Sequence, residues 1–153
     1  MTSWAFLSAT ELAAKIRDGA ISSVALTDYF IERIERLDND INAVVVRTFE
    51  SARSAAVAAD QAAADGRWLG PLHGVPMTIK EAYVLAGTPT TWGIEHFRHN
   101  GATKDGLIVE RFKQAGAHFL GKTNVPVELA DFQSYNPISV SYTHLTLPTT
   151  PYV

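Results

Sequence analysis

One lysine stands at the predicted end of a strand, where it could take part in acid–base chemistry. Lys80 follows Met77–Ile79, a short apolar run that predicts a buried strand. Burial in a medium of low dielectric disfavours the charged amine, so a lysine held in such a site can accept a proton from a hydroxyl nucleophile. Most lysines at strand ends only extend their ammonium group to solvent. Lys80 is therefore a candidate base whose role depends on its surroundings.

A second lysine completes a formal phosphate-binding pattern. Residues 116–123, Gly-Ala-His-Phe-Leu-Gly-Lys-Thr, match the pattern G-x-x-x-x-G-K-S/T. Such a loop needs flexible backbone whose N–H groups surround phosphates, with a strand before it and a helix after it. Here the centre is an apolar, strand-like run, and Pro126 follows too soon for a long helix. The segment therefore predicts a strand that ends in a polar loop, and nucleotide binding is the disfavoured alternative.

The remaining polar residues do not form a recognisable catalytic or metal-binding pattern. The chain has no cysteine, which excludes disulfides and thiol chemistry, and no histidine spacing typical of a metal site. His118 lies in an apolar run and is predicted to be a buried, hydrogen-bonded core residue, whereas His96 and His99 are predicted to be solvated. Glu81 and Asp105 are a candidate carboxylate pair, although the sequence does not fix their separation.

The elements that must position these residues alternate between helices and strands. Capping signals and apolar spacing predict helices over 8–19, 22–37 and 51–65, another that Asp105 caps, and a short helix after Pro126. Apolar β-branched runs predict strands over 43–46, 77–79 and 117–120. This order predicts an α/β fold in which N-terminal helices pack on a sheet.

Composition excludes several classes of protein. The 153 residues fit one domain; 46% are hydrophobic and 19% charged, which is typical of globular proteins. The net charge of -3 gives no basic excess for nucleic-acid binding. The sequence has neither a signal peptide nor an apolar stretch of about 20 residues, the length of a membrane span. We therefore expect a cytoplasmic protein without a membrane or nucleic-acid partner.

Four segments, in the same order and with similar spacing, resemble motifs of one known family. Residues 70–81, Gly-Pro-Leu-His-Gly-Val-Pro-Met-Thr-Ile-Lys-Glu, resemble its G-P-L-x-G-V/I-P-x-x-x-K-D segment. Residues 86–93 are similar to A-G-x-P-T-T-x-G, and residues 112–124 to L-x-x-A-G-A followed by L-G-K-T-N. Residues 131–138 resemble the segment that precedes the family's glycine–serine signature. These motifs are those of the amidase-signature family, and the resemblance covers about residues 8–138.

This resemblance implies a fold and a reaction. Residues 1–138 would be the N-terminal portion of an amidase domain, with an incomplete mixed sheet. Family members hydrolyse a carboxamide to an acid and ammonia, or transfer its nitrogen, through a Ser–cis-Ser–Lys triad. Lys80 aligns with the triad lysine, and the catalytic site needs no cofactor and no metal. The implied partner is a small-molecule amide in the full-length protein, and a homo-oligomer is compatible with the family.

The sequence also departs from the family pattern. The bridging serine and the nucleophile should follow Asn136, but the pattern ends at Ser139. Ser139 and Ser141 lie in no glycine-rich context, and neither is assigned a triad role. We therefore expect an inactive fragment that holds a base without its nucleophile. Residues 139–153 form an irregular, uncharged tail similar to translated sequencing-adapter DNA, and we hypothesise that they are not native.

Two questions about function stay open, and one expectation about the sheet follows. The resemblance does not distinguish a free amidase from the amide-hydrolysing component of glutamyl-tRNA amidotransferase. A non-catalytic α/β binding domain is the alternative from another functional class. Because later strands complete the family's sheet, we expect residues 44–46 and 117–120 to show open edges and exposed apolar faces.

Overall fold

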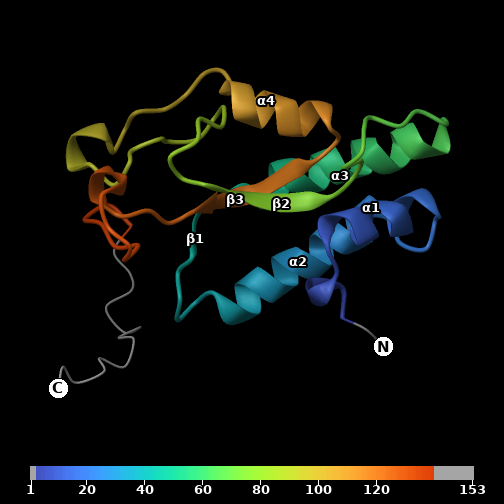
Figure 1. The fold of residues 1–153 in the computed structure, drawn as a ribbon, viewed down its shortest axis with the longest axis horizontal. Coiled ribbons are helices and arrows are strands. Elements are labelled where there is room, and N and C mark those ends of the chain that lie inside the picture. The colour runs from blue at the N-terminus through green and yellow to red at the C-terminus, as the bar shows by residue number, and fades with distance from the viewer. Residues whose placement is uncertain (1–2, 140–153) are drawn as a thin grey trace.

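The computed structural model describes residues 3–139, and its elements follow the predicted order (Figure 1). In sequence, this part of the chain contains α1 (Ala9–Arg17), α2 (Ser23–Leu37), β1 (Val44–Arg47), α3 (Phe49–Ala64), β2 (Pro76–Lys80), α4 (Leu107–Gln114) and β3 (His118–Thr123). Single 3-10 turns occupy Trp4–Phe6, Glu95–Phe97 and Val127–Leu129. The predicted α/β class, with helices packed on an incomplete mixed sheet, is confirmed. The predictions for residues 140–153 lie outside the described residues.

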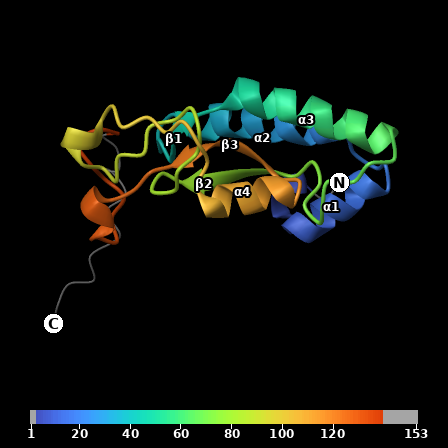
Figure 2. The same cartoon turned by 90° about the horizontal axis from the view of Figure 1, so that it is seen from above.

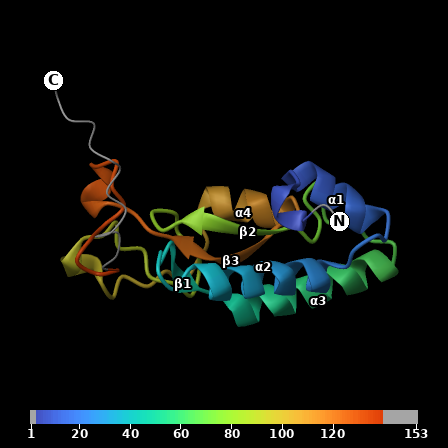
Figure 3. The same ribbon diagram turned by 90° about the horizontal axis from the view of Figure 1, so that it is seen from below.

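Within the described part of the chain, the sheet has three strands in the order β1-β3-β2. β2 runs parallel to β3, and β1 runs antiparallel to it, so the sheet is mixed. Helices α2 and α3 cover one face, whereas α4 covers the other (Figures 2 and 3). Because β2 and β3 are parallel, their carboxyl ends lie at the same edge, and the loops that follow them meet there.

A separate group of apolar side chains fills each contact between layers. Val109 of α4 packs with Ile79, Leu85 and Phe119 on one face of the sheet. On the other face, Leu120 packs with Ile31 of α2 and Ala52 of α3. A third group joins α1 and α2 beside the start of β2, and it consists of Leu12, Ala13, Ile16, Leu26 and Val75. The sheet thus separates the first two of these groups and contributes side chains to both.

The capping signals predict the cap of the first helix correctly, whereas α4 is present as predicted but without its predicted cap. Ser8 and Glu11 form the expected capping box, in which each side chain binds the other residue's backbone N–H. Asp105, however, does not cap α4, which begins after Gly106 without a side-chain cap. Its carboxylate instead accepts hydrogen bonds from the Ala86 amide at 2.8 Å and the Lys113 ammonium at 2.5 Å.

The third strand is longer and more central than predicted. β3 continues through Thr123, so the residues expected to form a polar loop belong to the sheet. It pairs on both sides, and all its residues except Thr123 are buried. The prediction that Ala117–Leu120 would expose an apolar face is therefore wrong. Within residues 3–139, β1 and β2 each pair on one side only, and a largely apolar pocket of about 400 Å³ opens between α2 and β2.

None of the helices in residues 3–139 combines the length and the apolar character needed to cross a bilayer.

Candidate active site

Lys80 lies at the carboxyl end of β2, and the sheet fixes its backbone. It pairs with Thr123 in β3, and the next amide, that of Glu81, donates to the Thr123 carbonyl at 2.8 Å. The Tyr83 amide then donates to the Lys80 carbonyl at 3.0 Å, which closes a turn. The side chain is exposed, and its ammonium makes no hydrogen bond or ion pair within residues 3–139. These residues alone do not supply the low-dielectric surroundings that a lysine base needs.

Glu81, next to the candidate base, is buried and holds a neighbouring loop. Its side chain is 3% exposed, and its two carboxylate oxygens accept hydrogen bonds from the amides of Thr91 (2.5 Å) and Trp92 (3.0 Å). The indole N–H of Trp92 donates to the Ala82 carbonyl at 3.2 Å. Glu81 and Asp105 thus bind different partners and do not form the carboxylate pair considered from the sequence.

Among residues 3–139, Lys122 is the largest fully buried side chain, and its position differs from that of a phosphate-binding lysine. It lies within β3, and its Nζ donates to the Pro89 carbonyl at 2.5 Å and to the Thr90 hydroxyl at 2.9 Å. Burial lowers the pKa of Lys122 to about 8, while the Glu81 carboxylate partly opposes this shift. The amine therefore binds the protein's own loop, which argues against the nucleotide-binding alternative.

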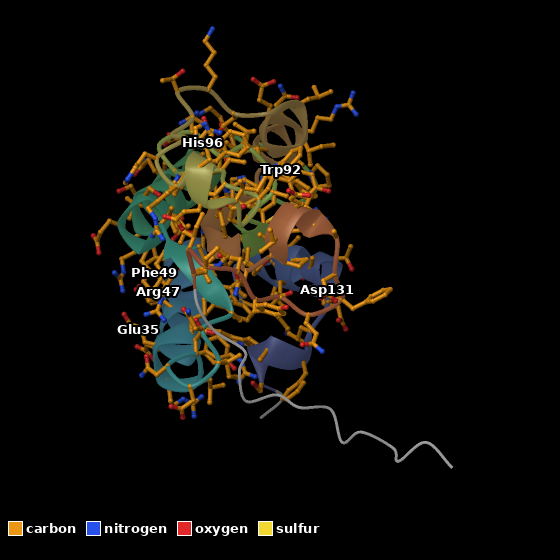
Figure 4. All side chains as sticks on the ribbon, turned by 90° about the vertical axis from the view of Figure 1, so that its left-hand side faces the viewer. Glu35, Arg47, Phe49, Trp92, His96 and Asp131 are labelled. Atoms are coloured by element: carbon orange, nitrogen blue, oxygen red, sulfur yellow. The ribbon has the colours of Figure 1, made fainter. Side chains whose placement is uncertain are left out.

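Two buried asparagines organise the chain after β3. The Asn136 amide group donates to the side-chain oxygen of Asn124 at 2.9 Å and to the Val125 carbonyl at 2.7 Å. Asn124 in turn donates to the Ser134 carbonyl at 2.9 Å. Figure 4 views the end of the molecule that holds these asparagines. In this view the label Trp92 marks the loop after β2, and the label Asp131 marks the loop after β3.

A pocket of about 510 Å³ lies in the segment that follows Lys80. Its lining is mostly apolar, with one hydroxyl and one carboxamide side chain. The lining residues are Ala82, Val84, Thr90, Trp92, Phe97, Asn100 and Ala102. An exposed lysine and an apolar hollow therefore occur on the same short stretch of chain.

Three histidines, His96, His99 and His118, lie where the sequence predicts them. His118 is buried, and its Nε2 is 2.9 Å from the Thr27 hydroxyl, so its prediction as a hydrogen-bonded core residue is confirmed. His96 and His99 are exposed, as predicted. Among residues 3–139, no group of three or more histidine, aspartate and glutamate side chains is arranged to hold a metal ion.

We predict that His118 makes the fold sensitive to acid. Burial lowers its pKa from 6.5 to about 4, and the Asp60 carboxylate only partly offsets this. Between these values only the unfolded chain takes up the proton, so stability present above pH 6.5 is lost as the pH falls towards 4. At 1.36 kcal/mol for each pKa unit, the loss is about 3 kcal/mol.

Denaturant unfolding at a series of pH values tests this prediction. The variant His118→Gln removes the titrating group and retains a hydrogen-bonding partner for Thr27, so its free energy of unfolding should fall less over the same range. Equal slopes for the two proteins would show that His118 does not cause the acid sensitivity.

Comparisons of sequence link the chain to known enzymes. A family model described as Amidase matches residues 25–144. The chain is 39% identical over 121 residues to an acylamidase of Rhodococcus erythropolis, an alignment that covers 79% of this chain and 25% of that protein. It is 44% identical over 115 residues to a glutamyl-tRNA(Gln) amidotransferase component of Thioalkalivibrio sulfidiphilus, with coverage of 75% and 24%.

Comparisons of structure also link the chain to known amidases. The native peptide amidase of Stenotrophomonas maltophilia superposes with a TM-score of 0.74 at 31% identity, over 81% of this chain and 26% of that one. A fatty acid amide hydrolase superposes with a TM-score of 0.82 at 29% identity, over 87% and 24% of the two chains. This chain therefore spans about a quarter of the length of the proteins it matches.

Proposed function

The chain belongs to the amidase family, and from this premise we propose that the whole protein hydrolyses a carboxamide to a carboxylic acid and ammonia, with Lys80 as the lysine of a Ser–cis-Ser–Lys triad. One observation carries the proposal: Lys80 ends a strand whose backbone is fixed by β3, directly before the loop that Glu81 holds. A rigid strand end gives a proton acceptor a defined position.

The proposed reaction begins with the neutral amine of Lys80. This amine takes a proton from the bridging serine, which takes one from the nucleophilic serine as its oxygen attacks the amide carbonyl carbon. Backbone N–H groups stabilise the oxyanion of the tetrahedral intermediate. The C–N bond then breaks, the nitrogen receives a proton and leaves as ammonia, and water hydrolyses the acyl-serine. Lys80 contributes the first proton acceptor in this sequence.

Several finer points belong to the same proposal. We propose that the whole protein supplies both serines from beyond the segment that resembles the family, and that residues 1–153 alone are inactive. The boundary at residue 138 remains a prediction. The substrate is a small-molecule amide, and the location is cytoplasmic, which agrees with a chain that has no cysteine.

Restoring the remainder of the fold tests this function. Residues 1–138 would be joined to the matching C-terminal part of the Rhodococcus acylamidase, and ammonia release would be measured from a panel of aliphatic and aromatic carboxamides. We expect hydrolysis by this extended protein and only buffer background from residues 1–153. A folded extended protein that hydrolyses none of the amides would contradict the proposal and favour a non-catalytic binding domain.

The similarity to an amidotransferase component supports a second candidate, transfer of the released ammonia rather than its loss to solvent. The two functions differ in substrate choice. A transferase component should prefer glutamine to other carboxamides, whereas a free amidase should hydrolyse amides that lack an amino-acid head group.

A further inference from the structure

We propose that Lys122 and Glu81 are positioning residues for the reaction, because together they hold residues 89–92 against the strand end that carries Lys80. This inference rests on the proposed function of Lys80. Neither residue is assigned a step in the reaction proposed above, and both are buried with opposite charges beside the candidate active site.

The two charged groups bind the same four-residue segment from complementary sides. The Lys122 ammonium binds its oxygen atoms, namely the Pro89 carbonyl and the Thr90 hydroxyl. The Glu81 carboxylate binds its N–H groups, those of Thr91 and Trp92. A cation thus meets acceptors and an anion meets donors along one short stretch of chain. These hydrogen bonds compensate each charge. Within residues 3–139, the Lys122 ammonium and the Glu81 carboxylate form no direct ion pair with each other.

Burial makes this arrangement sensitive to the loss of either partner. Lys122 is 0% exposed and Glu81 is 3% exposed, and an isolated buried charge is costly. Removing Lys122 takes away the positive charge that opposes the Glu81 carboxylate and frees the two acceptors of the loop. Removing the charge of Glu81 weakens the hold on the two amides. Each change should therefore loosen the same segment.

The pair influences Lys80 through the backbone and not by direct contact. In the parallel ladder, Lys122 pairs with Ile79, whereas Lys80 pairs with Thr123. Successive side chains alternate between the faces of a strand, so Lys80 points away from the face that carries Ile79. Glu81 follows Lys80 directly, and Trp92, whose amide binds Glu81, also binds the Ala82 carbonyl. Glu81 and Ala82, the two residues that follow Lys80, are thus both hydrogen-bonded to the segment 89–92.

A variant series tests this inference in the intact chain and in the extended protein. The variants are Lys122→Met, Glu81→Gln, the double variant, and Lys104→Met as an exposed control. In ¹H–¹⁵N spectra of the chain, the Trp92 indole N–H and the Lys80 and Glu81 amides should shift in both single variants, and the indole should exchange with water at least about tenfold faster. Lys104→Met should leave these signals unchanged.

Kinetics of the extended protein separate a positioning role from a purely structural one. A misplaced base lowers turnover more than substrate binding, so kcat should fall by about ten- to a hundredfold while KM changes less than about twofold. Because both residues act on one segment, the double variant should be hardly worse than the poorer single variant. Thr90→Val, which removes one acceptor and no charge, should change the same signals to a smaller extent if Lys122→Met does not fold.

Unchanged Trp92 and Lys80 signals in folded Lys122→Met or Thr90→Val would overturn the inference, as would fully additive effects in the double variant. The failure of the proposed function has a different signature. In that case the wild-type extended protein would release no ammonia, while the spectra of the chain would still show whether the pair holds residues 89–92.

Discussion

Lys80→Ala is expected to remove amide hydrolysis from the extended protein while its fold is retained. A positioned general base contributes about 10²- to 10⁴-fold to a rate, and the loss of the first proton acceptor should lower kcat by about 10³-fold or more. The melting temperature of the isolated chain should not change, because the Lys80 side chain is exposed and its ammonium makes no hydrogen bond or ion pair within residues 3–139. Ammonia release and thermal unfolding, measured on the same pair of proteins, check both expectations.

A second substitution distinguishes a base from a positive charge. Lys80→Arg keeps the charge but cannot be deprotonated in a protein, so it should be as inactive as Lys80→Ala if the amine accepts a proton. Lys104→Ala, on another exposed lysine, should retain full activity. Unaltered turnover by Lys80→Ala would reject the triad role, and substantial activity in Lys80→Arg would favour an electrostatic role.

The sequence predicts the helices and the strand that ends at Lys80 well because their signals are local. The capping box of Ser8 and Glu11 lies within one helical turn, and the apolar run before Lys80 marks a strand directly. Asp105 shows the limit of such signals. Its position suits a cap, but the Ala86 amide and the Lys113 ammonium bind its carboxylate instead. The Ala86 amide lies 19 residues before Asp105 and the Lys113 ammonium lies eight residues after it, so a pattern confined to the first turn of the helix does not reveal them.

The buried lysine was missed for a related physical reason. Gly121-Lys122-Thr123 looks like a polar loop, because a charged residue normally argues against a central strand. The groups that make its burial tolerable are the Pro89 carbonyl and the Thr90 hydroxyl, 33 and 32 residues earlier in the chain. Only the fold brings them together. One signal in the sequence could have suggested that Lys122 is buried. Its polar segment directly continues an apolar strand run, and the chain also contains a Thr-rich loop that could supply acceptors.

Gly121→Ala should be the most destabilising single change in the sheet. An added Cβ would lie 2.2 Å from the Val46 carbonyl oxygen and 2.9 Å from Cγ1 of Val44, both in β1. Backbone atoms of a paired strand cannot move away at little cost, so β1 must separate from β3. Overpacking of this kind, together with lost ladder hydrogen bonds, should lower the free energy of unfolding by about 4 kcal/mol.

Gly101→Ala is the matched control for this prediction, and ATP tests whether Gly121 has a phosphate-binding role. Gly101→Ala adds the same methyl group where no atom lies within 4 Å, so its unfolding midpoint in denaturant should stay close to that of the wild-type protein. If Gly121→Ala is as stable as Gly101→Ala, the close approach of β1 is not the reason why residue 121 is a glycine. A phosphate-binding role for this glycine predicts instead that ATP raises the melting temperature of the wild-type chain and not that of the variant. Because Lys122 already binds the loop over residues 89–90, we expect ATP to raise neither.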